Sequence, residues 1–333
     1  MTRTALLFTL LALLTAALFV ADLAVGSVYV SPGEIWGALT GKAGDPALQD
    51  IVLKIRLLKA VTAFAAGAAL AASGLEMQTL FRNPLAGPYV LGVSSGASLG
   101  VALFLLGAPL LGVSGHTFVQ SLGIAGAAWL GAALVLAAIL AVSRRIKDIM
   151  VILILGMMFG SGVASVVEIL QYLSDEAALK SFVVWTMGSL GDVTGSQLAL
   201  LLPVVSAGLV LAVAVIKPLN LLLLGENYAQ TMGLNIRRTR LLIFLSTVLL
   251  AGTVTAFCGP VGFIGLAVPH LARMAFASAD HRILMPASML AGAALLLVCD
   301  LAAKHFALPI NTITALMGIP VVIYVIVRNR NIF

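Results

Sequence analysis

Residues 197–217 read QLALLLPVVSAGLVLAVAVIK, a run with no charged side chain before Lys217. About twenty such residues match the length of a helix that crosses the hydrocarbon core of a bilayer. Because that core holds no water, a spanning backbone must satisfy its own hydrogen bonds, as a helix or as a closed barrel. Barrel strands alternate apolar and polar residues over about ten positions, and this run does not. It therefore predicts a membrane-spanning α-helix.

The same pattern recurs along the chain of 333 residues, of which 61% are hydrophobic and 10% charged. A soluble domain of this size cannot bury so much apolar surface. Ten apolar runs are present, near residues 4–25, 57–80, 90–112, 117–142, 148–172, 197–217, 239–257, 260–273, 284–303 and 308–327. We expect an all-α polytopic membrane protein, a single domain spanning residues 1–333 with about ten transmembrane helices.

Two of the runs are unusual. The first follows Arg3 and resembles a secretory signal, but no small-residue cleavage site follows it. We interpret it as the first spanning helix. The eighth run is short and rich in glycine and proline, so we expect a broken or tilted helix that packs within the protein or lines a cavity.

The formal net charge of +6 does not indicate nucleic-acid binding, because Lys and Arg lie in short stretches between the apolar runs. Cytoplasmic loops of membrane proteins carry such an excess. With ten spans and the amino terminus inside, 13 of the 19 basic residues fall on the cytoplasmic side and 6 on the outer side. The distribution predicts that both termini are cytoplasmic.

The sequence gives little support for a catalytic site or an ion-coupling site in this chain. The two cysteines, Cys258 and Cys299, lie in or beside apolar runs and are interpreted as packing residues. An enzyme requires a constellation of reactive groups, whereas Glu76, Glu168 and Asp300 are isolated in the sequence. A carrier coupled to protons or sodium usually has ionisable residues in mid-helix, and these are sparse. An ion-coupled secondary transporter is therefore the weaker alternative.

A source of energy is also missing from the chain. Residues 37–43 read GALTGKA, which resembles a phosphate-binding loop but is one residue short and lacks the final Ser or Thr. We expect no cofactor in this chain, with ATP and Mg²⁺ bound by a separate ATPase subunit.

Three stretches interrupt the apolar pattern. FRNPLAGP at 81–88, followed by LGVSSGA at 91–97, contains two prolines and a glycine and predicts a tight cytoplasmic turn. LGENYAQTMGLN at 224–235 predicts a short helix ending at Gly233, because glycine tolerates the left-handed position after a helix. CGPVGFIGLAVPHLAR at 258–273 is followed by DHR at 280–282.

Together these stretches resemble the FecCD family, the permeases for ferric siderophores, haem and cobalamin in type II ABC importers. The family patterns NPLA-x-P-x-x-LGVSSGA, LGE-x-x-A-x-x-LG and GFxGLxxPHxxR with a following DHR are matched in order, apart from Met232 where the second pattern has its last leucine. The resemblance implies a type II ABC importer permease fold in the bacterial inner membrane. It implies a homodimer of permeases, two ATP-binding subunits and a periplasmic substrate-binding protein. The implied cargo is an iron chelate, either a ferric siderophore or haem, with cobalamin or another corrinoid as the alternative.

The resemblance also implies roles at the cytoplasmic face. Coupling to the ATPase is assigned to a segment of about 220–236, at Gly225, Glu226, Ala229, Met232, Gly233 and Leu234. A cytoplasmic gate is assigned to Asn83, Leu85, Val142 and Ser143.

At the outer face, the resemblance assigns docking of the binding protein to Arg56, Lys59 and Lys304. Long cations at the outer boundary are expected to be accessible to carboxylates of a partner. The family's Arg-Leu-Pro-Arg is Arg-Leu-Leu-Lys here, and lysine lacks the bidentate fork of arginine, so we expect a weaker or differently shaped pairing. The alternative interpretation is that these cations only reach the lipid headgroups.

Overall fold

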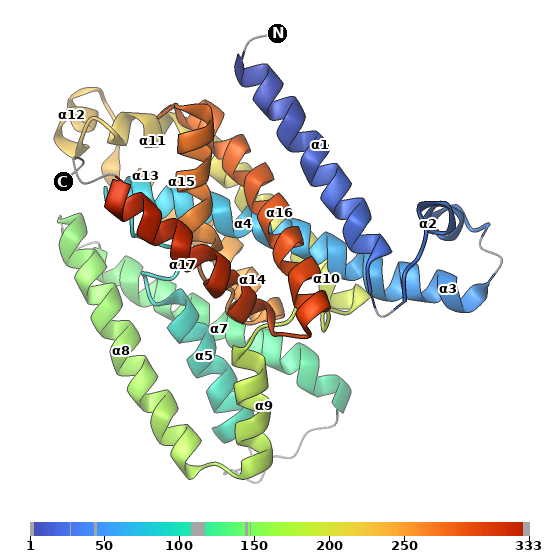
Figure 1. Cartoon of the computed structure of the whole chain (residues 1–333). Coiled ribbons are helices and arrows are strands. Elements are labelled where there is room, and N and C mark those ends of the chain that lie inside the picture. Colours follow the sequence, from blue (N-terminus) through green and yellow to red (C-terminus); the bar gives the residue numbers. More distant parts are fainter. Residues whose placement is uncertain are drawn as a thin grey trace.

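The computed structural model describes residues 3–26, 28–42, 45–107, 117–143, 146 and 148–328. Within those ranges the regular elements are helices, and no strand occurs among them (Figure 1).

The first half of the chain forms α1 (Arg3–Ala24), α2 (Pro32–Leu39), α3 (Pro46–Asp50), the π-helical turn η1 (Ile51–Arg56), α4 (Leu57–Leu80), α5 (Val93–Ala102), the π-helical turn η2 (Leu103–Gly107), α7 (Thr117–Ser143) and α8 (Ile149–Leu173). The second half forms α9 (Glu176–Thr186), α10 (Gly195–Ala214), α11 (Ile216–Leu222), α12 (Glu226–Thr231), α13 (Ile236–Thr247), the π-helical turn η3 (Val248–Gly252), α14 (Thr253–Cys258), α15 (Ile264–Phe276), α16 (His281–Phe306) and α17 (Ile310–Arg328).

The predicted spans are confirmed in order. Among the described residues, seven helical stretches are long and apolar enough to cross a bilayer, and shorter apolar helices occupy Val93–Gly107, Ile264–Phe276 and Ile310–Val325. The eighth run is the short helix α15, which has Pro269 inside it and follows non-helical residues. The fold is therefore all-α and polytopic.

Polar caps start several helices where the sequence leaves an apolar run. Asp148 Oδ1 accepts the backbone N–H of Met150 at 2.8 Å before α8, and Asp175 Oδ1 accepts that of Ala178 at 2.7 Å before α9. Thr194 forms a capping box at the start of α10. These side chains satisfy backbone donors that the first helical turn leaves unpaired.

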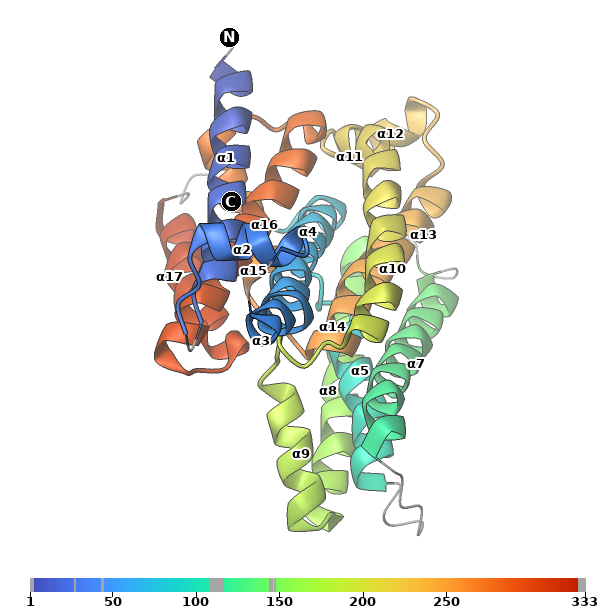
Figure 2. The ribbon, with the colours of Figure 1, turned by 90° about the vertical axis from the view of Figure 1, so that its right-hand side faces the viewer.

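Helix α4 forms the centre of the molecule, with α16, α15, α10 and α13 packed around it (Figure 2). Every residue from Ala65 to Leu80 is buried. A Cβ on Gly67 would overlap the carbonyl oxygen of Gly292 in α16, and one on Gly74 would overlap that of Gly265 in α15. Lipid gives helices no hydrophobic reason to associate, so such close backbone approach supplies the packing energy.

The helices at the periphery are far less buried than α4. In their most apolar windows 6% of α1 and 28% of α8 is buried, against 67% for the stretch that includes α4. Figure 1 shows α11 and α12 on one side of the molecule and α2 and α3 on the opposite side. The predicted coupling and docking residues are thereby separated by the length of the spanning helices.

Candidate functional site

The loop after α4 is held in a defined shape by Asn83. Its side-chain Oδ1 accepts the backbone N–H of Leu85 at 2.9 Å, and its carbonyl accepts that of Ala86 at 3.1 Å. Arg82 has a left-handed backbone with φ of 48°, which is uncommon for a residue other than glycine. The turn buries Ala86 and leaves Leu85 43% exposed. The two predicted gate residues therefore have different parts: Asn83 shapes the turn, and Leu85 projects from it.

Two contacts tie this loop to the segment around α15. The ring Nε2 of His270 lies 2.8 Å from the carbonyl oxygen of Pro84. At the other end of the loop, the hydroxyl of Tyr89 donates to the carbonyl oxygen of Val261 at 3.2 Å. These two contacts hold both ends of the loop against the segment from Val261 to His270.

The predicted helix before Gly233 is present as α12. Gly233 is left-handed, with φ of 87°. Its N–H donates to the carbonyl of Gln230 at 2.9 Å, and the N–H of Leu234 donates to that of Ala229 at 3.0 Å. This pair of bonds is a Schellman motif, which satisfies carbonyls at the end of a helix.

The exposed face of α12 is apolar at two positions. Tyr228 and Met232 are each 56% exposed, whereas Ala229 is fully buried. Glu226 anchors the helix to α13, because Arg240 Nη2 lies 2.7 Å from both of its carboxylate oxygens. Helix α12 is thus a short, anchored element that presents large side chains outward.

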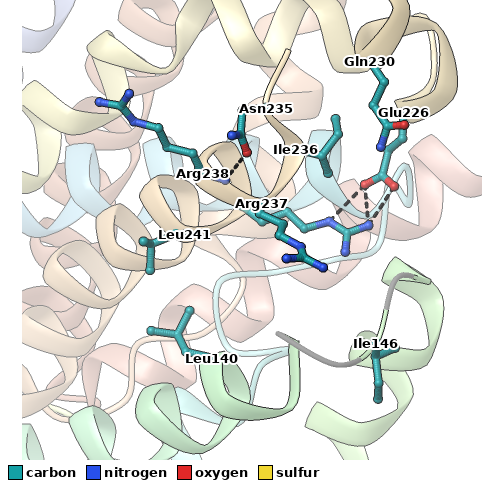
Figure 3. A pocket seen from close by; sticks show the side chains of 10 residues that line it. Leu140, Ile146, Glu226, Gln230, Asn235, Ile236, Arg237, Arg238 and Leu241 are labelled. Atoms are coloured by element: carbon teal, nitrogen blue, oxygen red, sulfur yellow. Dashed lines mark hydrogen bonds and ion pairs between the residues drawn. The ribbon is translucent and has the colours of Figure 1, made fainter. Parts of the chain in front are cut away.

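Two cavities surround α12. One, of about 650 Å³, is lined by α12, the start of α13, Leu140 near the end of α7, and Ile146 (Figure 3). The other, also of about 650 Å³, is lined by Arg82, Ile149 and residues of the segment 224–231. The structure therefore brings the predicted gate loop and the predicted coupling segment together.

The second pair of predicted gate residues lies at the end of α7. Val142 is 40% exposed, whereas the side chain of Ser143 lies outside the described residues. Val142 also lines a cavity of about 510 Å³ between α7 and α8, opposite Ile152 and Met158.

At the opposite side, the predicted docking cations are engaged within the chain. Lys59 Nζ lies 3.0 Å from Asp300 Oδ1. Lys304 Nζ bridges two buried carboxylates, at 2.8 Å from Asp22 Oδ1 and 3.0 Å from Asp300 Oδ2. The side chains of Lys59 and Lys304 are 22% and 12% exposed. These two lysines were expected to be accessible, but their side chains are mostly enclosed. Each lysine already neutralises a buried acid within the chain.

Arg56 is the most enclosed of the three cations. It is 6% exposed, and its Nη1 donates to the carbonyl oxygens of Leu23 and Ala24, each at 2.8 Å. Its Nη2 donates to the carbonyl oxygen of Val28. Arg56 thus satisfies the carbonyls at the end of α1 and fixes that helix to the start of α4.

Three further acidic residues, Asp22, Glu76 and Glu168, lie in different surroundings. Asp22, the partner of Lys304, was not singled out by the sequence analysis, although a lone acid at the end of the first apolar run is a signal for a paired site. Glu76 is fully buried in α4, with the hydroxyl of Thr247 at 3.4 Å from its Oε2. Glu168 lies exposed on α8.

The family model for the FecCD transport family matches residues 13–328. The chain belongs to this family. A relative, the hemin transport system permease protein HmuU of Yersinia pestis, is 37% identical over 336 residues, covering 97% of this chain and 95% of the relative. The vitamin B12 import system permease protein BtuC of Klebsiella pneumoniae is 37% identical over 328 residues, covering 97% and 94%.

A solved structure extends the likeness to three dimensions. It is described as an inward-facing conformation of a metal-chelate type ABC transporter, with a TM-score of 0.84 and 31% identity over 98% of this chain and 99% of that one. The FecCD chain is thus a permease subunit of an ABC importer with the type II importer fold. The family resemblance predicted from the three motifs is confirmed.

Proposed function

We propose that this FecCD permease forms a homodimer in the bacterial inner membrane and moves a metal chelate inward along a path between the two copies. Each copy is a single permease domain with both termini in the cytoplasm. The observation that carries the proposal is the cavity shared by Arg82 of the gate loop and by the segment 224–231. The gate loop and the segment 224–231 are therefore neighbours, which supports a coupling of their movements.

The proposed cargo is an iron chelate, either a ferric siderophore or haem. The hemin permease relative and the metal-chelate transporter structure support this class. Cobalamin is the second candidate, because a vitamin B12 permease is equally similar, at 37% identity. Selectivity among these cargoes is proposed to reside largely in the binding protein.

Energy is proposed to come from two ATPase subunits that bind ATP and Mg²⁺, while this chain holds no cofactor. The exposed side chains of Tyr228 and Met232 support a partner surface on α12, since large apolar groups are enriched at such contacts. The coupling set is Gly225, Glu226, Ala229, Met232, Gly233 and Leu234, in which the buried and glycine positions shape the helix end.

Docking of the periplasmic binding protein is proposed at Lys59 and Lys304, with Arg56 as the third docking residue. Partner carboxylates would compete with Asp300 and Asp22 for the two lysines. Arg56 is committed to three backbone carbonyls, so its contribution includes holding the surface in shape.

The proposal is tested by reconstituting the permease with its ATPase and binding protein and measuring uptake of a ferric siderophore, haem and cobalamin in parallel. ATP-dependent uptake of a siderophore or of haem supports the assignment, and uptake of cobalamin alone selects the second candidate. A complex that assembles and carries none of the three contradicts the cargo. Uptake that needs an ion gradient and no ATPase would establish a secondary transporter instead.

A further inference from the structure

The third sequence motif contributes a buried histidine at the start of α16. His281 is 1% exposed. Its ring contacts two other helices: Nε2 lies 2.8 Å from Thr79 Oγ1 in α4, and Nδ1 lies 2.7 Å from Asn220 Oδ1 in α11. One imidazole thereby joins three helices that are far apart in the sequence.

The orientation of the Asn220 amide follows from its neighbours. Its Nδ2 donates to Asp280 Oδ1 at 2.6 Å, and its Oδ1 accepts the backbone N–H of His281 at 2.9 Å. The backbone N–H of Arg282, followed by the Asn220 amide, holds the pKa of the Asp280 carboxyl below its usual value. An ionised carboxylate only accepts hydrogen bonds, so the amide nitrogen faces Asp280 and the amide oxygen faces the histidine.

The tautomer of His281 follows from that orientation. Since Asn220 Oδ1 is an acceptor, Nδ1 of the ring carries the proton and donates to it. In a neutral ring Nε2 is then an acceptor, and the hydroxyl of Thr79 donates to it. The same hydroxyl lies 2.9 Å from the carbonyl oxygen of Leu75 in its own helix. Its single proton therefore has two alternative acceptors, one along α4 and one across to α16.

The cluster of Asn220, His281 and Thr79 is connected along the chain to α12 and to the gate loop at Asn83. Asn220 lies in α11, which leads through Gly225 into α12. Thr79 lies about one helical turn before Asn83, the residue that shapes the gate loop. Arg273 Nη1 donates to Gln78 Oε1 at 2.6 Å and so holds the same turn of α4 from α15. Movement of α11 can reach the gate loop through the histidine without passing through the rest of the bundle.

We propose that Asn220, His281 and Thr79 form a relay that positions the gate loop according to the position of α12. The inference rests on the proposed function, because it assigns the step that connects ATP hydrolysis to gate movement. Coupling between two sites requires an element with two discrete arrangements. In the relay these are the hydrogen bond from the Thr79 hydroxyl to His281 and the hydrogen bond from the same hydroxyl to the carbonyl of Leu75. A brace that served stability alone would not change how ATP affects the gate.

Thr79→Val removes the hydroxyl at nearly constant volume, and Thr79→Ser keeps it. Each is combined with a spin label at Leu85→Cys in the assembled complex with ATPase subunits. The measurement is the ATP-dependent change in the label-to-label distance between the two permease copies, together with the rate of ATP hydrolysis. We expect Thr79→Val to reduce the ATP-dependent shift in the open-to-closed ratio by about 2- to 30-fold, with ATP hydrolysis within about twofold of the parent. Thr79→Ser is expected to behave as the parent.

Asn220→Ala breaks the relay at its other end and serves where Thr79→Val fails to assemble. The double variant Thr79→Val/Asn220→Ala is expected to be no worse than either single variant, because one broken link already disconnects the relay. An undiminished shift in Thr79→Val or Asn220→Ala, or additive losses in the double variant, overturns the relay alone. If the parent complex itself shows no ATP-dependent shift, the proposed function falls together with the relay.

Discussion

Lys59 Nζ lies 3.0 Å from Asp300 Oδ1, so a cation predicted to receive the binding protein is paired within its own chain. Lys304 contacts the same carboxylate from the next turn of α16. Lys59 and Lys304 therefore neutralise buried acids, and a small part of each side chain remains exposed.

Replacing Lys59 tests the docking proposal. Lys59→Gln removes one partly exposed charge, and we expect the Kd for the binding protein to rise about fivefold, as for a loss of about 1 kcal/mol from such a pair. Binding of the purified binding protein to the permease–ATPase complex measures it at low and moderate salt. Lys54→Gln is the matched control, because Lys54 is exposed and paired with Asp50. An equal effect of both variants would assign the loss to general charge rather than to docking.

Replacing Lys304 tests the structural task. Lys304→Ala leaves the buried carboxylate of Asp22 without its cation, and loss of one partner of a buried pair costs about 3–5 kcal/mol. Thermal unfolding in detergent is expected to show a clear fall in Tm. Lys54→Ala, at an exposed pair, is expected to cost about 0–1 kcal/mol. Adding Asp22→Asn to Lys304→Ala should restore part of the stability; if it does not, the ion pair is not the cause.

The exposed face of α12 gives a test of ATPase coupling. Met232→Lys places a charge at a 56% exposed apolar position. Disrupting a central contact of this kind costs about 2 kcal/mol, so we expect binding of the ATPase to weaken about 30-fold. Co-purification with the ATPase measures the loss, and an unchanged Tm of the isolated permease excludes misfolding. Trp36→Lys, at a 69% exposed apolar residue of α2 on the opposite side, serves as the control. Normal ATPase binding by Met232→Lys would contradict the assignment of α12.

The packing of α4 depends on its glycines. Gly67→Ala would place a methyl group against the carbonyl oxygen of Gly292, and we expect a loss of about 1–3 kcal/mol, because a packed interface cannot absorb the extra volume. Gly126→Ala, in α7, meets no atom within 4 Å and is expected to be neutral or stabilising by up to about 1 kcal/mol. Thermal unfolding of both variants measures the difference. Equal Tm values would show that α4 and α16 can separate without cost.

Local features were predicted well because their causes are local. The helix end at Gly233 follows from the backbone freedom of one glycine, and the structure shows it there with φ of 87°. Run length and composition located the spans in the same way, since each spanning helix satisfies its own backbone hydrogen bonds whatever its neighbours are. The three motifs added the family, which the comparisons confirm.

Side-chain contacts between different helices could not be predicted from local sequence. Lys304 bonds to Asp22 across 282 positions in the sequence, and Thr79 meets His281 across 202. Lys304 was expected to be accessible, whereas packing of α16 against α1 encloses it. Composition and run length decide which segments enter the membrane, because the solvent acts on each segment separately. Only the tertiary packing decides which charges face one another, because a buried charge is stable only beside the partner that the neighbouring helix supplies.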